Sequence, residues 1–167
     1  MTLSRIIADG IIKWEPCAEN DVICARFSFD EWHRIVADIH SDDEWFEFLK
    51  ENPDFVRCFV LKRCDDCHSI AFIYLLKEYD DERIISIHGG GWESPLMHYR
   101  GYILMIKHLL DQGIKVRTYC RLSNTAAIRF DRSVGFVPYR YTKEEVFMWI
   151  SLKRLKNSKL YRRFYKK

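Results

Sequence analysis

Hydrophobic residues change their spacing along the chain from a helical period to an extended one. Between residues 32 and 39 they recur at intervals of three and four, which predicts one apolar stripe of an α-helix. A Ser-Phe-Asp-Glu capping box at 28–31 precedes this helix, and a second box at 41–44 begins a short helix that Pro53 ends. The first third of the chain therefore predicts two helices, after an initial strand over 3–14.

From residue 55 onward the pattern becomes extended and then alternates between helices and strands. Runs rich in Val, Ile, Phe and Tyr, joined by short polar turns, predict antiparallel strands over 55–62, 68–77 and 83–88. Apolar periodicity, with Gly113 and Gly135 as helix-ending residues, then predicts two more helices and three more strands. These are helices over 99–112 and 124–134, and strands over 115–121, 136–141 and 145–152.

This order of elements predicts an α+β fold with a mixed, mostly antiparallel sheet flanked by helices. A β-α-β unit over residues 83–121 lies at its centre. The free N–H groups at the start of a helix and the positive end of its dipole both favour anions. We therefore expect an anionic cofactor to bind where strand 83–88 leads into helix 99–112.

Composition indicates one folded domain. The chain has 167 residues, 48% of them hydrophobic and 15% aromatic, which is enough for a packed core and too short for two ordinary domains. Charged residues interrupt the apolar stretches, so none is long enough to span a bilayer. The six cysteines occur without a secretory signal, which indicates reduced thiols. We expect a cytoplasmic protein that does not act at a membrane.

Charge is distributed unevenly along the chain. Eight of the 27 Lys and Arg residues fall in 153–167, which holds no Asp or Glu, while 19 basic and 24 acidic residues remain in 1–152. The interpretation is a single domain over 1–152 followed by a basic C-terminal tail over 153–167, solvated at the surface. Binding of nucleic acid by this tail is the less favoured alternative, because the rest of the chain is mildly acidic.

Two segments resemble conserved motifs of a known superfamily. Residues 98–103 read H-Y-R-G-Y-I, and residues 124–136 read N-T-A-A-I-R-F-D-R-S-V-G-F. The first resembles the Q/R-x-x-G-x-G/A motif of the GNAT acetyltransferases, and the second resembles their N-x-x-A-x-x-(F/L)-Y-x-x-x-G-F segment. The matching positions of the second segment are Asn124, Ala127, Phe130, Gly135 and Phe136.

The resemblance implies an acyl-CoA-dependent N-acyltransferase that moves an acetyl group from acetyl-CoA to an amine by direct attack. The acceptor would be a small molecule or a peptide. The family holds pyrophosphate on backbone amides of the first motif and pantetheine along the preceding strand. The residues that would bind the cofactor are then Ile87, His98, Tyr99, Arg100, Gly101, Tyr102, Ile103 and Asn124. No metal site is expected, and the oligomeric state is left open.

Two residues depart from the family pattern. Asp131 stands where the family often has a Tyr that protonates the leaving thiolate, and an ionised carboxylate is a poor proton donor at neutral pH. Ile103 stands where a small residue lets the backbone approach pyrophosphate. Tyr99 and Tyr102 are candidates for a substitute acid. These departures keep a second hypothesis open, a catalytically inactive binding or regulatory module of the same fold.

The run Ser-Ile-His-Gly-Gly-Gly-Trp at 86–92 ends the third strand of the central group. In the fold that the chain resembles, this strand parts from its neighbour and the thioester lies in the gap. Glycines there would let the backbone approach a ligand. His88 is then the candidate general base, since a histidine pKa lies near working pH. The alternative is a structural histidine followed by a flexible glycine turn.

Two other features suggest sites of their own. Residues 64–68 have the C-x-x-C-H spacing of haem attachment and of half a zinc site, but no second ligand pair follows at a suitable spacing. They are interpreted as the acidic tip of a hairpin. Aromatic residues crowd 14–48, and we expect most of them in the core, with one or two lining the acceptor pocket that the resemblance implies.

Overall fold

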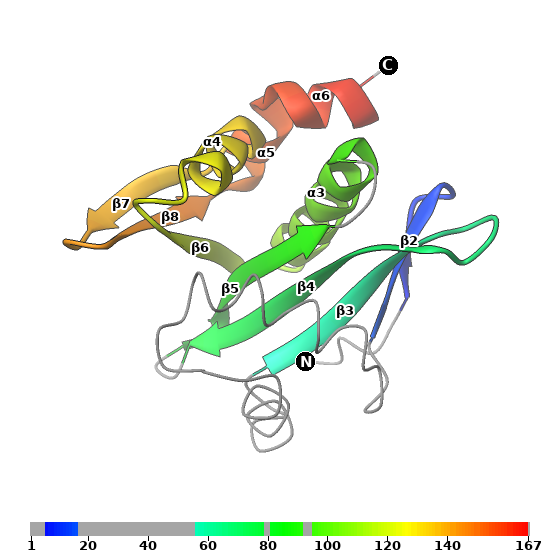
Figure 1. The fold of residues 1–167 in the computed structure, drawn as a ribbon, viewed down its shortest axis with the longest axis horizontal. Helices are drawn as coiled ribbons and strands as arrows, with labels where there is room; N and C mark the ends of the chain where they lie inside the picture. The colour runs from blue at the N-terminus through cyan, green and yellow to red at the C-terminus, as the bar shows by residue number, and fades with distance from the viewer. Residues whose placement is uncertain (1–5, 17–55, 79–80, 92–94, 167) are drawn as a thin grey trace.

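The computed structural model describes residues 6–16, 56–78, 81–91 and 95–166 (Figure 1). The helices predicted between residues 28 and 53 lie outside these ranges. The described elements follow one another in the chain as β1 (Ile7–Ala8), β2 (Ile12–Pro16), β3 (Val56–Arg63), β4 (Ser69–Glu78), β5 (Asp81–Gly91), α3 (Pro95–Asp111), β6 (Lys115–Arg121), α4 (Thr125–Val134), β7 (Val137–Tyr141), β8 (Glu145–Ile150), α5 (Leu152–Asn157) and α6 (Lys159–Tyr165).

The described strands form one sheet in the order β1-β2-β3-β4-β5-β6-β8-β7. Neighbouring strands are antiparallel except β5 and β6, which are parallel and are connected through α3. This is the predicted β-α-β unit. The prediction of an α+β fold with a mixed, mostly antiparallel sheet is therefore confirmed.

The initial strand predicted over 3–14 is wrong in one respect, because two short strands take its place. Gly10 turns the chain between β1 and β2 with a φ of +89°, a conformation that a residue without Cβ adopts readily. The Asp9 carboxylate stabilises this turn by accepting hydrogen bonds from the N–H groups of Ile11 and Ile12. An isolated apolar pattern does not distinguish one strand from a tight hairpin of two.

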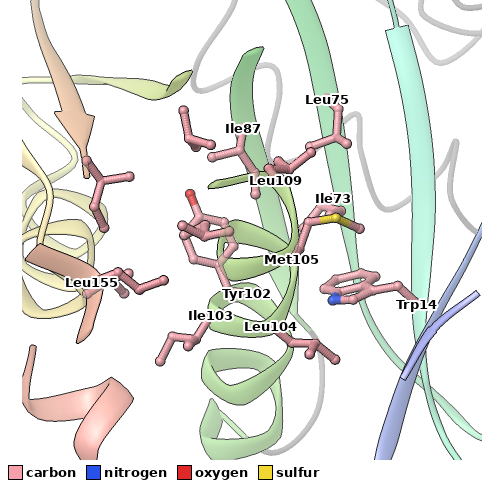
Figure 2. Packing of buried hydrophobic residues seen from close by; sticks show 14 of the residues in the cluster. Trp14, Ile73, Leu75, Ile87, Tyr102, Ile103, Leu104, Met105, Leu109 and Leu155 are labelled. Atoms are coloured by element: carbon pink, nitrogen blue, oxygen red, sulfur yellow. The ribbon is translucent and has the colours of Figure 1, made fainter. Parts of the chain in front are cut away.

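The core lies between α3 and one face of the sheet (Figure 2). From α3, the buried side chains include Tyr102, Ile103, Met105 and Leu109, and they meet residues of β2, β4 and β5. Burying each large apolar side chain stabilises the fold by about 1.5–3 kcal/mol. The sheet residues labelled beside α3 are Trp14, Ile73, Leu75 and Ile87.

The glycine run does not form a flexible turn. Gly89, Gly90 and Gly91 extend β5 and pair with Ile73, Phe72 and Ala71 of β4. Hydrogen bonds to the neighbouring strand hold these glycines in an extended conformation. The residues next to the glycines in the sequence do not indicate this pairing, because it is made with a distant segment. The alternative of a flexible glycine turn is therefore wrong.

The basic C-terminal segment is folded rather than solvated, so that interpretation is wrong. Residues 152–165 form α5 and α6, which begin at the capping side chains of Ser151 and Ser158. Leu155 and Tyr161 belong to the buried core, while the basic side chains of the two helices are exposed. Within each of the two helices the apolar positions stand three to four residues apart, and the high charge hid that amphipathic signal.

Asp9 connects this segment to the rest of the molecule. Its carboxylate accepts a hydrogen bond from Arg100 Nε of α3 at 2.6 Å and one from the Tyr165 hydroxyl of α6 at 2.9 Å. Although burial opposes ionisation, these bonds and two backbone N–H groups lower the pKa of Asp9. A turn near the start of the chain, the central helix and the last helix are therefore tied at one point.

Among the helices that the structure describes, none has both the length and the apolar composition needed to cross a bilayer.

Candidate active site

The parallel strands β5 and β6 separate after a short paired stretch. Their register joins only Ile84–Ser86 to Lys115–Arg117, although β5 continues to Gly91 and β6 to Arg121. Figure 1 shows the two strands diverging from that point, with α3 beginning at the end of β5. Ile87 is the first β5 residue beyond the paired stretch. The gap is the feature expected of a site that takes an extended ligand between two strands.

His88 lies at this gap, in contact with the neighbouring strand. Its ring centroid is 4.4 Å from that of Tyr119 on β6, in an edge-to-face arrangement. The side chain is buried, and burial lowers its pKa to about 3. The imidazole is therefore neutral at pH 7, as a general base must be, but it holds an accepted proton weakly.

Gly89, the next residue along β5, lies too close to β4 for a side chain. A Cβ at this position would be 2.4 Å from the carbonyl oxygen of Phe72 and 2.8 Å from Cγ2 of Ile73. The sheet itself thus requires this glycine. Its presence beside the gap is not by itself evidence that a ligand approaches the backbone.

The motif 98–103 lies inside α3 rather than at its start. An α-helix leaves only its first N–H groups without intrahelical partners, and in α3 these belong to Leu96 and Met97, since Pro95 has no N–H. The N–H groups of residues 100–103 lie beyond the first turn and donate within the helix. The predicted contact of these four amides with pyrophosphate finds no free donors in this conformation.

Gly101 allows α3 to pack closely on the sheet. A Cβ there would lie 2.4 Å from Cδ2 of Leu61, a fully buried residue of β3. The Gly101 carbonyl also accepts a hydrogen bond from Trp14 Nε1 at 2.7 Å. Helix packing therefore explains this glycine without a ligand.

Substituting Gly101 tests that explanation. We expect Gly101→Ala to destabilise the protein by about 1–3 kcal/mol, because the added methyl group displaces Leu61 in a packed core. Leu61→Ala alone should cost about 2–5 kcal/mol. Chemical denaturation of the double variant should show a cost smaller than the sum, since the shortened residue 61 makes room for the methyl group. Strict additivity, with acetyl-CoA affinity lost in Gly101→Ala, would instead assign the glycine to the cofactor.

The other residues of the motif are engaged on different sides of α3. Arg100 pairs with Asp9, and its guanidinium lies 5.6 Å from the centroid of the Tyr165 ring. Ile103 is fully buried in the core. Its branched side chain therefore faces the protein interior. The size of this side chain alone does not imply that it would block the approach of pyrophosphate to the backbone.

His98 and Tyr99 belong to an aromatic cluster between α3 and α4 that the sequence pattern did not reveal. Tyr99 stacks on Phe130 with ring centroids 4.6 Å apart, and His98 stacks on the same ring at 6.0 Å. Burial lowers the pKa of His98 to about 4. Within the ranges described, its Nε2 atom is buried and has no hydrogen-bond partner. The separation of 32 residues between His98 and Phe130 left no local signal of the contact.

Asn124 has the structural role predicted for it. Its side chain accepts a hydrogen bond from the N–H of Ala127 at 3.2 Å and caps α4. Gly135 ends the same helix with a φ of +116°, which favours glycine. Any contact between the Asn124 amide and the cofactor stays a prediction.

Asp131 is buried in a polar cluster with Tyr102 and Cys120, and is only 4% exposed. The Cys120 thiol donates to its Oδ2 at 3.2 Å, and a hydrogen bond links it to the Tyr102 hydroxyl. Burial raises the pKa of Asp131 to about 7, against the opposing effect of these bonds. The raised pKa favours the protonated form, so this carboxyl group is a better proton donor near neutral pH than an ordinary, ionised Asp.

Tyr102 is a poor candidate for the substitute acid. Burial raises its pKa well above the usual range, and the nearby Asp131 adds to the shift. Its hydroxyl is hydrogen-bonded to Thr118 and Asp131, on the core side of α3. A hydroxyl with such a high pKa cannot donate its proton efficiently near neutral pH.

The segment 64–68 forms the tip of the β3–β4 hairpin, as predicted. Asp66 pairs there with Arg63 and accepts a hydrogen bond from the N–H of His68 at 2.9 Å. Over the described ranges, no group of three or more His, Cys, Asp or Glu side chains is arranged to hold a metal ion.

Comparison with known proteins identifies the fold. No family model and no curated protein matches the chain. Among solved structures, FdhC, a nucleotide-linked sugar GNAT, has a TM-score of 0.72 at 14% identity, covering 98% of this chain and 99% of its own. A probable acetyltransferase of the GNAT family from Chromobacterium violaceum has a TM-score of 0.68 at 13% identity, covering 89% and 86%.

A third similar structure is the spermidine N-acetyltransferase SpeG from Vibrio cholerae, with a TM-score of 0.62 at 16% identity over 89% of this chain and 98% of its own. At these identities the likeness shows the fold alone. The chain has the fold of the GNAT acetyltransferases.

Proposed function

We propose that this protein is an acyl-CoA-dependent N-acyltransferase that transfers an acetyl group from acetyl-CoA to an amine. The observation that carries the proposal is the separation of β5 from β6 beyond Ser86 and Arg117, next to the start of α3. Where two strands separate in the middle of a sheet, their backbone N–H and C=O groups no longer bond to each other. These groups then need other hydrogen-bond partners. A ligand with its own amide groups suits such a gap.

Residues around the gap fit the parts of acetyl-CoA. Beyond Ser86, alternate N–H and C=O groups of β5, starting near Ile87, face the gap and can bond the amides of pantetheine. The free N–H groups of Leu96 and Met97, with the helix dipole, suit the pyrophosphate. We place the pyrophosphate there rather than on residues 100–103. His98, Tyr99 and Asn124 stay proposed contacts of the same ligand.

When bound, acetyl-CoA would supply the thioester. In the transfer, the acceptor nitrogen forms a bond to the acyl carbon while the C–S bond breaks, one proton leaves the nitrogen, and the sulfur takes one up. Strand N–H groups at the gap would polarise the carbonyl, and the fold would hold the two reactants in line. His88 is the proposed acceptor of the amine proton, because it lies at the gap and is neutral at pH 7.

A catalytically inactive binding module is the second candidate. Two observations favour it: the low pKa of His88, and the engagement of Arg100 and Gly101 in packing. Such a module would still bind acyl-CoA through the gap, so cofactor binding and turnover separate the two candidates.

The first experiment is calorimetric titration with acetyl-CoA, followed by a thiol-release assay over a panel of amines. We expect micromolar binding and turnover of at least one amine. His88→Ala should lower kcat by about 10²-fold or more, whereas His108→Ala, on the exposed end of α3, should not. Binding without turnover would establish the inactive module, and an unchanged rate for His88→Ala would remove the base. If neither acetyl-CoA nor longer acyl-CoAs bind, the proposal is overturned.

A further inference from the structure

A cavity of about 870 Å³ lies at the C-terminal end of α4, between that helix, β7, α5 and α6. α6 contacts both α4 and α5, and the three helices gather near the C-terminus of the chain (Figure 1). Gly135 lines the cavity, whereas Asn124, a proposed contact of acetyl-CoA, caps the other end of α4. At 1.5 Å per residue the two ends are roughly 16 Å apart.

The walls of this cavity are held by the core of the protein. A Cβ at Gly135 would lie 3.0 Å from the carbonyl oxygen of Arg154, so the end of α4 meets α5 without a side chain between them. Leu155 fixes α5 and Tyr161 fixes α6, because both side chains are buried in the core. The cavity is therefore present in the folded protein before any ligand binds.

Four basic side chains from three helices line the cavity. They are Arg132 of α4, Lys153 and Arg154 of α5, and Lys159 of α6, and all four are exposed. Within the described part of the chain none of them forms an ion pair. The lining, as far as the described residues form it, contains no Asp or Glu. The cavity therefore concentrates positive charge that no neighbouring carboxylate offsets.

The groups that could oppose this charge are engaged elsewhere. Asp131 adjoins Arg132 in the chain, but it is buried and bonded to Cys120 and Tyr102. The carbonyl end of α4 disfavours anions, yet the Gly135 N–H donates to the carbonyls of residues 131 and 132. The remaining polar lining includes the hydroxyl groups of two serines and the side chain of Asn157.

An exposed aromatic ring borders the cavity. Trp149 of β8 is 41% exposed, and the Cζ atom of Arg154 lies 5.8 Å from the centroid of its ring. Trp149 also pairs with Val137, a lining residue of β7, and paired residues of neighbouring strands share one face of the sheet. Basic side chains beside an accessible aromatic ring are the combination that binds a phosphate backbone and stacks on an unpaired base.

We propose that this cavity binds a single-stranded nucleic acid, with its phosphates on the four basic side chains and one base stacked on Trp149. The proposal goes beyond the acyl transfer and does not depend on it. A single small anion would leave most of a cavity of this size, and most of its charges, unused. A membrane surface is disfavoured, because the apolar sides of α5 and α6 lie in the core and are not available for insertion.

The acidic excess of residues 1–152 counted against nucleic-acid binding by a solvated tail. The structure changes the basis of that comparison, because three of the basic residues of this tail are held beside Arg132 in one cavity. Charges act mainly within the Debye length, which is about 8 Å at physiological salt. The local charge of the cavity, rather than the net charge of the chain, therefore decides whether a strand binds.

The test is fluorescence anisotropy of labelled RNA and DNA strands of about 12 nucleotides, a length in the range of known single-strand sites, with the full-length protein. Four phosphate contacts predict a slope of about −3 for log K against log salt, which is roughly a 50-fold loss of affinity between about 50 and 200 mM salt. No binding at the lower salt concentration, or an affinity independent of salt, would overturn the proposal.

Charge variants locate the site. Lys153→Gln, Arg154→Gln and Lys159→Gln should each weaken binding and make the salt slope shallower by about 0.7. The matched control is Lys143→Gln, which removes the same charge from an exposed lysine between β7 and β8, outside the cavity. The control should keep the wild-type slope. An equal loss in the control would mean that binding follows net charge alone, and would overturn the cavity.

The stacking contact has a separate readout. Trp149→Ala should lower the affinity for the strand about tenfold or more, and Trp149→Phe should recover part of it. A strand without bases gives the matched comparison, since Trp149→Ala should not weaken its binding further. A loss of the same size with both strands would mean that residue 149 acts only through the structure, and would overturn the stacking contact.

Competition identifies the class of ligand. A duplex of the same sequence should bind more weakly than the single strand, because its bases are not available for stacking. Polyglutamate and phosphatidylserine–phosphatidylcholine vesicles, at equal charge, should not displace the strand. Displacement by polyglutamate would assign the cavity to an acidic protein, and displacement by vesicles would assign it to a membrane. Either result would overturn the proposal.

A last competitor separates this proposal from the proposed function. Saturating acetyl-CoA should leave the affinity for the strand unchanged, because the two sites lie at opposite ends of α4. Competition between them would assign the cavity to the cofactor and overturn the nucleic-acid site. Binding of the strand that the charge variants weaken would support the site even if acetyl-CoA did not bind and no amine were acetylated.

Discussion

Deletion of residues 153–167 is expected to abolish cooperative folding. The deletion removes Leu155, which is fully buried, and the Tyr161 and Tyr165 side chains of α6. Replacing a buried leucine by alanine alone costs about 2–5 kcal/mol, and a typical domain has only about 5–15 kcal/mol of stability. Circular dichroism and urea unfolding of the truncated protein should therefore show no cooperative transition.

A point variant and a charge variant control this prediction. Leu155→Ala should keep a cooperative transition at lower urea concentration. Replacement of the exposed Lys153, Lys156 and Lys159 by Gln should leave stability nearly unchanged, because no ion pair of these side chains occurs in the described part of the chain. A truncated protein that unfolds like the full chain would show that α5 and α6 are dispensable. The charge variant, not the truncation, is the proper test of nucleic-acid binding by this segment.

The pH dependence of stability should contain a large contribution from Asp131. The pKa of Asp131 is about 7 in the folded protein, against 3.8 for an ordinary Asp. Between these two pH values the folded state therefore binds more protons than the unfolded state. The stabilising contribution of Asp131 is fully present below about pH 4 and is lost as pH rises through about 7. Between about pH 5 and pH 9 this amounts to ~3 kcal/mol.

The measurement is the difference between wild type and Asp131→Asn in urea unfolding across this pH range. A difference is needed because His88 and His98, whose pKa values burial lowers, act in the opposite direction and gain stability as pH rises. Asp131→Asn should gain on the wild type by about 3 kcal/mol from pH 5 to pH 9. Asp111→Asn, at the exposed end of α3, is the matched control for the removal of one carboxylate. A constant difference would mean that Asp131 titrates normally.

The fold was predictable wherever a local signal carried the information. The strand over 115–121 has the predicted bounds, and α4 begins after Asn124 and ends at Gly135, because capping and the left-handed turn depend on residues a few positions apart. The same holds for the β-α-β unit, since its connection through a helix follows from the order of elements. The two motifs were enough to indicate the GNAT fold.

The site was less predictable, because its properties depend on residues far apart in the chain. Gly101 matched a cofactor motif, yet the tertiary structure packs it against Leu61, forty positions earlier. Arg100 belongs to the same motif, and the tertiary structure pairs it with Asp9 across 91 residues. A motif reports residue types and spacing, and neither says which side of a helix will meet the sheet.

The amino-acid sequence by itself determined the type and order of the elements from β3 to β8, because hydrophobic period, caps and turns are local properties of the chain. Only the tertiary structure decided which groups are removed from water. That choice lowers the pKa of His88, raises that of Asp131, and docks a segment with six basic residues as two helices. Burial and charge proximity depend on contacts between distant segments, and these contacts set the chemistry that each side chain can perform.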